Sequence, residues 1–285
     1  MRISSTWQDY ELIDTSNGER LERWGSHVLI RPDPVVVWTN ENLSPRWASA
    51  EARYIRSAKG GGHWEYFRDV PQQWRVAYKD LTFKVKPTGF KHTGLFPEQA
   101  VNWDTAAELL KQRNHANLLN LFAYTGGATL SAASVGTNVS VTHVDAAKGM
   151  VQWAKENAVL SKIDGNVRYI TDDAKKFIAR EIRRGVKYDA VILDPPSYGR
   201  GPTGEMWKLE DELYSLMKLV AESLSDKPLF VMLNGYTAGL SPSVMKCLMQ
   251  TVFGGADITA DEIGLPVTHT GLVLPAGNTA IVKFE

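Results

Sequence analysis

The chain has 285 residues, 44% of them hydrophobic, which suffices for one full-sized domain with its own core and a smaller second domain. With 32 basic and 32 acidic residues the formal net charge is zero, so any surface for a polyanion must be a local patch. The single cysteine, Cys247, excludes an internal disulfide and a cysteine-based metal cluster, and we expect no metal site.

Membrane and export signals are not evident. No apolar run approaches the roughly 20 residues that span a bilayer, and the N-terminus lacks the apolar core of a signal peptide. We therefore expect a soluble cytoplasmic protein without membrane contact.

The first 90 residues predict a small β-rich domain. Short apolar runs such as residues 28–30 and 35–38 alternate with turn-forming pairs such as Asn17-Gly18, which is typical of hairpins. One hairpin is predicted from 74–78 and 81–85. We expect residues 1–90 to form a separate domain with a role in substrate recognition.

From about residue 101, strands and helices alternate. Ala147, Val151 and Ala154, for example, recur at helical spacing after a strand that ends near Asp145. Strands separated by amphipathic helices predict a parallel sheet with right-handed crossovers and helices on both faces. The last two apolar runs have no helix between them, so the final strand should be antiparallel. The predicted fold class is α/β, with a seven-stranded Rossmann-like sheet in residues 91–285.

The first strand of this sheet ends in a glycine turn. Residues 117–122 predict a buried strand, Thr125-Gly126-Gly127 a turn, and residues 128–135 the start of a helix. A glycine turn before a helix N-terminus can cradle a nucleotide-like ligand. It is as often only a tight turn.

Acidic residues follow the next strands at the edge where open α/β sheets bind ligands. Asp145 lies 19 positions beyond Gly126, where a carboxylate can accept from a ribose diol. Asp172 and Asp173 follow the third strand and can accept from an exocyclic amine. The fourth strand is followed by the segment 194–201, which begins Asp-Pro-Pro.

Each of these features has a structural alternative. The aspartates could cap the helices that follow them, and the two prolines could simply stop a strand. Their occurrence at successive strand ends, in this order, favours a ligand site.

Two motifs that the turn lacks narrow the choice of ligand class. It has neither the G-x-G-x-x-G spacing of a dinucleotide fold nor the Gly-Lys-Ser/Thr of a P-loop. Carboxylates without phosphate-binding groups suit an adenosine that carries no phosphate, such as S-adenosylmethionine. A nucleotide-binding dehydrogenase is the competing class.

Four stretches carry a family resemblance. FAYTGGATL, THVDAAKGMVQWAKENA, ITDDAKKFI and LDPPSYG resemble successive motifs of class I S-adenosylmethionine-dependent methyltransferases. The sequence is most similar to the branch with large-subunit ribosomal RNA methyltransferases, which includes 5-methylcytosine enzymes with a PUA domain. VKPTGFKHTGLFPEQAVNW resembles the segment that folds over the cofactor in this branch. The resemblance covers roughly residues 81–197 and is specific for cofactor and fold, much less for the methyl acceptor.

The resemblance implies roles for particular residues. Asp173, followed by Ala174, should meet the adenine, with Asp172 as the alternative. Phe96 could contact the cofactor or, equally, be a hydrophobic plug under the covering segment. The methyl-transfer site should be lined by Asp194, Pro195 and Pro196. The cofactor-binding residues implied are Phe96, Gln99, Phe122, Ala123, Tyr124, Thr125, Gly126, Gly127, Asp145, Ala146, Asp172, Asp173, Ala174 and Asp194.

Two departures bear on the reaction. The 5-methylcytosine mechanism needs a cysteine thiolate, but the place after the fifth strand reads Asn234-Gly235-Tyr236. Cys247 shares an apolar helix face with Leu248, which favours a buried structural thiol over a nucleophile. The N-terminal part is not an evident PUA domain, so RNA binding by it does not follow from the resemblance.

A nitrogen acceptor fits these residues better, because its lone pair can attack the methyl group directly. Asp194 and the Pro195 carbonyl could orient the amine. Tyr198, the fourth catalytic candidate, could stack on a base or pack over the sheet edge.

A local patch favours RNA as the substrate. Residues 46–91 hold ten Lys or Arg against four Asp or Glu, interleaved with aromatic residues. The same aromatics could instead be a core and the charges a solvated face. We expect a base of ribosomal RNA as the acceptor. A small molecule, a protein, or 5-methylcytosine chemistry through Cys247 are the alternatives.

Overall fold

The computed structural model describes residues 1–57, 61–201, 204 and 206–284. The chain forms two compact units. The sheet unit comprises Met1–Arg2, Gln99–Ile263 and Gly277–Glu285, and the N-terminal unit comprises Ile3–Glu98 and Gly264–Ala276. The boundary between residues 90 and 91 stays a prediction about separately folding domains.

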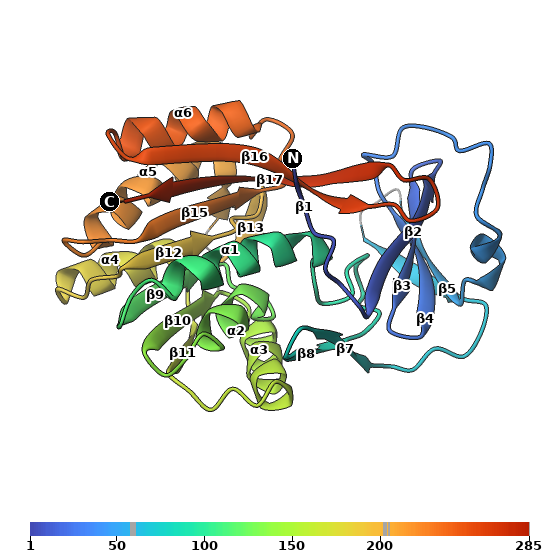
Figure 1. Ribbon diagram of the computed structural model, residues 1–285, viewed down its shortest axis with the longest axis horizontal. Coiled ribbons are helices and arrows are strands. Elements are labelled where there is room, and N and C mark those ends of the chain that lie inside the picture. Colours follow the sequence, from blue (N-terminus) through green and yellow to red (C-terminus); the bar gives the residue numbers. More distant parts are fainter. Residues whose placement is uncertain (58–60, 202–203, 205, 285) are drawn as a thin grey trace. The chain divides into compact units, whose positions relative to one another are not determined.

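The sheet unit is built on a mixed, eight-stranded sheet in the order β1-β16-β17-β15-β12-β9-β10-β11 (Figure 1). Strands β9, β10, β11, β12 and β15 run parallel, and β17 is antiparallel to β15. The α/β class and the antiparallel last strand are confirmed. The count is eight and not seven because a two-residue strand joins the edge. The strands are β1 (Arg2–Ile3), β9 (Ala116–Leu121), β10 (Val139–Asp145), β11 (Val167–Thr171), β12 (Ala190–Leu193), β15 (Phe230–Gly235), β16 (Asp257–Pro266) and β17 (Val273–Lys283).

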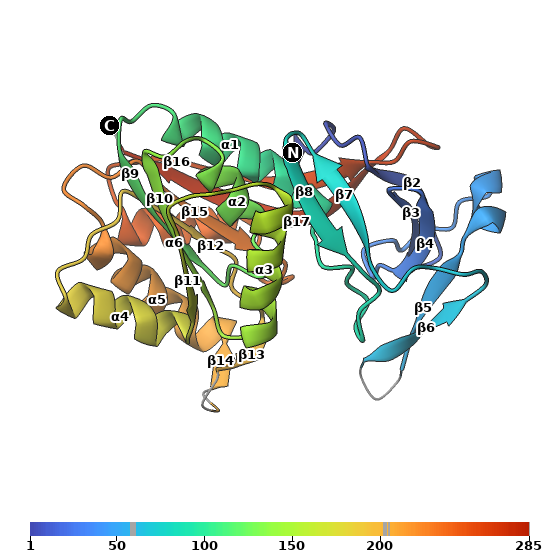
Figure 2. The same ribbon diagram turned by 90° about the horizontal axis from the view of Figure 1, so that it is seen from below.

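Helices cover both faces of this sheet (Figure 2). Alternate residues of β12 show why: Ala190 and Ile192 pack in the core under α1 and α2, whereas Val191 and Leu193 pack in the core under α4, α5 and α6. Among the residues described, no helix is long and apolar enough to cross a bilayer. The helices are α1 (Ala100–Leu110), α2 (Gly127–Ala133), α3 (Lys148–Leu160), α4 (Ala174–Arg183), α5 (Leu209–Ser223) and α6 (Pro242–Val252).

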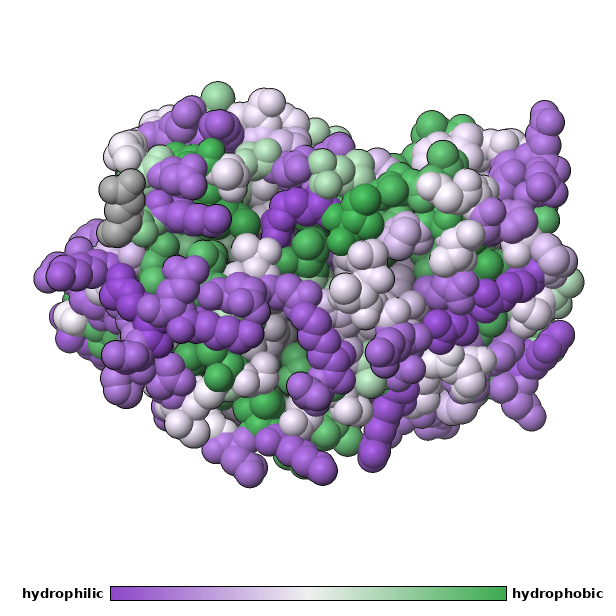
Figure 3. All heavy atoms as spheres, viewed as in Figure 1, coloured by the Kyte–Doolittle hydropathy of each residue, from purple (hydrophilic) through white to green (hydrophobic). Residues whose placement is uncertain are grey.

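Helix α4 shows how an amphipathic pattern sets burial. Phe177 and Ile178 are fully buried against the sheet, whereas Lys176 and Arg183 are exposed. Hydrophilic side chains likewise cover much of the molecular face drawn in Figure 3. Asp173 caps its first turn. The sequence period of 3.6 is therefore sufficient to predict which side of α4 faces the core.

Helix α6 corrects one prediction. Cys247 is exposed, not buried. The core face of α6 is formed by Met245 and Met249, which lie one turn apart and are fully buried. Cys247 lies two positions from each, about 200° around the helix, and so points away from the core.

The N-terminal unit holds a five-stranded sheet in the order β2-β3-β4-β5-β6 and a separate hairpin of β7 and β8. The β-rich N-terminal region and the predicted hairpin are both confirmed. Strands β4 and β5 are parallel, and the other pairs are antiparallel. The elements are β2 (Tyr10–Ser16), β3 (Glu19–Trp24), β4 (His27–Pro32), η1 (Pro45–Ser49), β5 (Ala52–Arg56), β6 (Gly62–Tyr66), β7 (Trp74–Tyr78), β8 (Leu81–Val85) and, at the end of the unit, η2 (Pro97–Gln99).

A buried ionic cluster lies inside this unit. The carboxylate of Glu22 accepts two hydrogen bonds from the Arg31 guanidinium, at 2.5 and 2.8 Å, and one from the Tyr10 hydroxyl at 2.6 Å. Arg20 lies 3.4 Å from the same carboxylate. Burial alone would raise the pKa of Glu22, but Arg20 and Arg31 outweigh it and lower the pKa to about 2.

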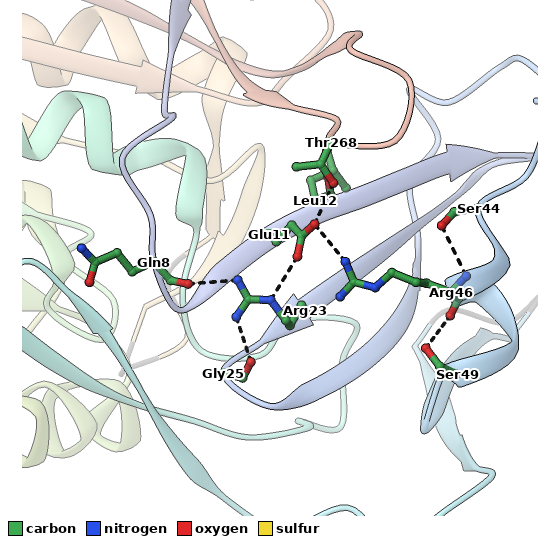
Figure 4. A network of polar contacts seen from close by, with 9 residues as sticks. All are labelled: Gln8, Glu11, Leu12, Arg23, Gly25, Ser44, Arg46, Ser49 and Thr268. Atoms are coloured by element: carbon green, nitrogen blue, oxygen red, sulfur yellow. Dashed lines mark hydrogen bonds and ion pairs between the residues drawn. The ribbon is translucent and has the colours of Figure 1, made fainter.

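A second, more exposed network ties the segment Gly264–Ala276 to β2 (Figure 4). Glu11 lies at its centre and accepts from Arg23 at 3.1 Å, Arg46 at 2.9 Å and Thr268 at 2.7 Å. The backbone N–H of Thr268 also donates to the Leu12 carbonyl at 2.9 Å. Two parts of the chain far apart in sequence are joined here by hydrogen bonds that no local pattern encodes.

We predict that Glu22→Gln lowers the free energy of unfolding by about 3–5 kcal/mol, because it leaves two buried guanidinium groups without their shared carboxylate. Glu11→Gln is the matched control and should cost about 0–1 kcal/mol, because its ion pairs are partly exposed. Urea unfolding followed by tryptophan fluorescence measures both. Equal losses would contradict a special role for the buried cluster.

The pH dependence of stability should follow the same carboxylate. Because the pKa of Glu22 falls on folding from 4.5 to about 2, its contribution is fully present above pH 4.5 and is lost as the pH drops toward 2. Urea titrations across this window should show a steeper loss for the wild type than for Glu22→Gln.

Candidate active site

The strand order reverses beside β9, which has β10 on one side and β12 on the other. Open α/β sheets bind ligands at such a switch point, beyond the carboxyl ends of the strands. The predicted residues at the first, second, third and fourth strand ends therefore meet at one edge of the sheet. The contacts among them define the candidate site.

The turn after β9 is held in an unusual backbone conformation. Phe122 has φ 54°, Tyr124 has φ 50° and Gly126 has φ 91°, all in the left-handed region. Only glycine adopts this region without strain, so the two aromatic residues must be held there by their surroundings. The N–H of Ala123 donates to the Val144 carbonyl at 3.0 Å, as part of that support.

The two glycines are required by close packing. A Cβ on Gly127 would lie 2.4 Å from Cζ2 of Trp103, and one on Gly126 would lie 3.0 Å from Cβ of Ala154. Helix α2 therefore approaches α1 and α3 closely at its first turn. Thr125, just before the glycines, is buried and accepts from the Asn157 side chain at 2.9 Å through its carbonyl.

Asp145 connects this turn to the second strand end. One carboxylate oxygen accepts from the Tyr124 N–H at 2.9 Å and the other from the Ala147 N–H at 2.8 Å. Each oxygen keeps a second lone pair, so the carboxylate can still accept two hydrogen bonds from a diol. Burial raises the pKa of Asp145, and the bonds from Ala147 and Tyr124 partly oppose the rise.

The helix-capping alternative does not describe Asp145. Helix α3 begins at Lys148 with Ala147 as its N-cap residue, and no side chain caps it. Ala146 lies half-buried between the carboxylate and this helix. The Asp145 carbonyl accepts from the Asp172 N–H at 3.1 Å, which joins the second strand end to the third.

The capping alternative does describe Asp173. Its carboxylate accepts from the Lys176 N–H at 2.9 Å and caps α4, of which the buried Ala174 is the first residue. The Asp172 carboxylate accepts from the Asp173 N–H at 2.9 Å and pairs with the Arg180 guanidinium. Both aspartates are thus held by α4, and contact of either one with an adenine stays a prediction.

The fourth strand end carries the Asp-Pro-Pro segment. Asp194 is half-buried, Pro195 is buried and Pro196 is exposed. Tyr198 is 53% exposed on a small hairpin of β13 (Tyr198–Arg200) and β14 (Met206–Lys208), where its hydroxyl lies 3.0 Å from the Met206 sulfur. The two roles considered for it, stacking on a base and packing over the sheet edge, both stay predictions.

Trp207, which sequence analysis missed, brings two of the predicted segments together. Its indole N–H donates to the Pro196 carbonyl at 2.6 Å, and its ring lies 5.1 Å from the ring of Phe122. It is 93% buried, with 7% of its surface exposed. A lone tryptophan after a glycine-rich stretch was the only signal of it in the sequence.

A buried amide network was also missed. The Asn102 amide nitrogen lies within hydrogen-bond distance of Gln99 (2.8 Å), Asn234 (3.0 Å) and Thr279 (2.8 Å). Gln99 in turn donates to the Tyr236 hydroxyl at 2.7 Å. Asn234 and Tyr236 stand where a catalytic cysteine would follow the fifth strand, and this network occupies both.

Three predicted residues lie in the covering segment: Gln99 in the sheet unit, and Lys91 and Phe96 in the N-terminal unit. The ring of Phe96 is 5.1 Å from that of His92. The Ser197 hydroxyl lies 2.6 Å from that of Thr237, which joins the fourth strand end to the fifth. Within the described ranges, no group of three or more His, Cys, Asp or Glu could hold a metal ion.

Sequence comparison places the chain beside known methyltransferases. A protein family described as S-adenosylmethionine-dependent methyltransferase matches residues 38–226. The ribosomal RNA large subunit methyltransferase K/L of Pseudoalteromonas atlantica is 30% identical over 167 residues, 58% of this chain and 23% of the relative. That of Shewanella frigidimarina is 33% identical over 145 residues, 49% of this chain and 20% of the relative. The chain spans less than a quarter of the length of these two relatives.

Structural comparison agrees. The crystal structure of the SAM-dependent methyltransferase from Agrobacterium tumefaciens is 34% identical, has a TM-score of 0.93, and matches over 99% of this chain and 92% of that one. SMU.776, crystallised as a complex with SAH, is 20% identical with a TM-score of 0.74, over 98% of this chain and 76% of that one. The second likeness shows a shared fold.

We predict that Gly127→Ala lowers the affinity for S-adenosylhomocysteine at least about ten-fold, because the added methyl group overlaps the buried Trp103 and α2 must shift. Gly149→Ala in α3 is the matched control: its methyl group meets nothing within 4 Å, and its affinity should not change. Isothermal titration calorimetry measures both. Wild-type affinity in Gly127→Ala would show that the position of this turn does not matter for binding.

Proposed function

Because the chain belongs to the family of S-adenosylmethionine-dependent methyltransferases, we propose that its methyl acceptor is a base of ribosomal RNA. Family membership confirms the predicted enzyme class and the predicted cofactor. The alternative of a nucleotide-binding dehydrogenase is therefore wrong. The RNA acceptor is supported by the names of the K/L relatives, of which this chain matches a part. An RNA substrate also supports the expected cytoplasmic location.

The contacts of Asp145 are the single observation that carries the cofactor site. Its carboxylate is half-buried, is fixed by two backbone N–H groups and retains two lone pairs, which suits a ribose diol. In this proposal the turn at Gly126 and Gly127 lets the backbone approach the methionine part. The adenine then lies beside Asp172 or Asp173 at the third strand end.

The acceptor site in this proposal is the fourth strand end. The cofactor supplies an electrophilic methyl group. Asp194 and the Pro195 carbonyl orient the protons of the acceptor nitrogen, so that its lone pair points at the methyl carbon. The N–C bond forms as the C–S bond breaks, the bonding pair stays on sulfur, and the nitrogen proton passes to solvent.

Two observations favour direct methyl transfer over a cysteine adduct. Asn234 and Tyr236 are held in the amide network after the fifth strand. Cys247 is exposed in the middle of α6, not at a strand end. Tyr198, half-exposed beside the Asp-Pro-Pro segment, has a free ring face for a base in this proposal.

We predict that the enzyme transfers label from methyl-labelled cofactor to ribosomal RNA. Total RNA, protein and metabolite fractions would be incubated in parallel, and labelled RNA digested to nucleosides to identify the methylated atom. Label on a nitrogen is the expected result. Label only outside RNA would remove the RNA acceptor, and label on cytosine C5 that Cys247→Ser abolishes would restore the cysteine mechanism.

Asp194→Ala should reduce the rate of methyl transfer by about 10²–10⁴-fold, because the acceptor amine loses the group that orients it. Its affinity for S-adenosylhomocysteine should stay within a few-fold of the wild type. Cys247→Ser is the control and should retain the wild-type rate. If affinity and rate fall together in Asp194→Ala, this residue supports the fold and not the acceptor.

A further inference from the structure

Residues 88–92 of the N-terminal unit form a loop, which we call the 88–92 loop. Three side chains donate hydrogen bonds to its backbone carbonyls. The Trp64 indole N–H donates to the Thr88 carbonyl at 2.8 Å, and the Tyr54 hydroxyl to the Gly89 carbonyl at 3.3 Å. Arg31 of the buried ionic cluster donates to the Lys91 carbonyl at 3.1 Å. The loop is thus fixed to β4, β5 and β6.

The loop also closes on itself. The Thr88 hydroxyl oxygen accepts from the Phe90 N–H at 3.2 Å and lies 2.7 Å from the His92 carbonyl. This arrangement turns the side chain of Phe90 outward, and 68% of its surface is exposed. A fixed backbone that displays an aromatic ring to solvent loses little conformational entropy when the ring is covered.

Two cations beside this ring are unused. Neither the Lys91 ammonium nor the Arg56 guanidinium makes a hydrogen bond or an ion pair with any residue that the structure describes. The Lys91 ammonium is repelled by the positive charges of Arg20, Arg31 and Arg56, and the Asp33 carboxylate partly opposes this effect. Burial, reinforced by these cations, lowers the pKa of Lys91 to about 8.

The other titratable side chains near the loop leave its surroundings positively charged. The pKa of His92 is lowered to about 3 by burial and then by Arg31, Lys91 and other cations, so this side chain is neutral. Arg20 lies 3.4 Å from the Glu22 carboxylate and 3.5 Å from that of Asp33. These two carboxylates offset the buried Arg20 and Arg31, so the excess positive charge at the loop is that of Lys91 and Arg56.

We propose that the 88–92 loop is an RNA-contact element, in which Phe90 stacks on an unpaired base and Lys91 with Arg56 binds a neighbouring phosphate. An anion there would relieve the mutual repulsion of the cations, and an exposed ring stacks on any base. The base must be unpaired, because a base inside a double helix has both faces covered by its stacked neighbours. This inference rests on the proposed function and adds a place on the chain where the RNA is held.

The test measures the binding of the full chain to a fluorescently labelled single-stranded oligoribonucleotide by anisotropy over a salt series. Phe90→Ala should weaken binding roughly 5- to 100-fold at fixed salt. Lys91→Gln and Arg56→Gln should each reduce the slope of log K against log salt by about 0.7. Matched controls are Tyr214→Ala, an aromatic residue 50% exposed on α5, and Lys246→Gln on α6, which should change neither quantity.

Methylation assays and calorimetry separate the possible failures. If the wild type transfers no label to RNA, the proposed function fails and the inference fails with it. If the wild type methylates RNA but Phe90→Ala and Lys91→Gln bind RNA normally, only the inference is overturned. Loss of affinity for S-adenosylhomocysteine at unchanged RNA affinity would overturn the inference and assign the loop to the cofactor.

Discussion

The sheet unit depends most on one half-buried aspartate, Asp145. Asp145 accepts from the N–H groups of Tyr124 and Ala147, and its carbonyl accepts from Asp172. These bonds hold the left-handed turn after β9, the start of α3 and the end of β11 in one arrangement. A group in this position both builds the cofactor site and takes part in it, because a carboxylate has more acceptor positions than the backbone uses.

A second set of contacts extends this arrangement across the sheet. Trp207 links the first turn to Pro196, and Ser197 links that segment to Thr237. The fifth strand end is then fixed by the Asn102 amide. Side chains therefore tie four of the five strand ends together, and a backbone hydrogen bond joins the third, that of β11, to the second. These links pre-organise the place where cofactor and acceptor would meet.

The N-terminal unit uses charge where a small sheet has little room for apolar packing. Glu22, Arg31 and Arg20 form its buried cluster, and the same guanidinium that binds Glu22 also holds the backbone of the 88–92 loop. Such a cluster adds little net stability but strongly penalises any arrangement that leaves one member unpaired. The buried cluster thus both specifies the fold of this unit and supports the loop that carries Phe90 and Lys91.

Local patterns determined much of this protein from sequence alone. Apolar periods of 2 and 3.6 predicted the strands and the helices, because burial of one face depends on spacing along the chain. The lack of a helix between the last two apolar runs predicted the antiparallel last strand. The order of motifs at the strand ends predicted the cofactor.

Tertiary structure alone decided that Asp173 caps α4 while Asp145 caps nothing, since both roles suit an aspartate in sequence. It also decided that Cys247 faces solvent, because neighbouring elements choose which of two apolar stripes on α6 is covered. Contacts such as that of Asn102 with Asn234 join residues 132 positions apart, and only the folded chain brings them within reach.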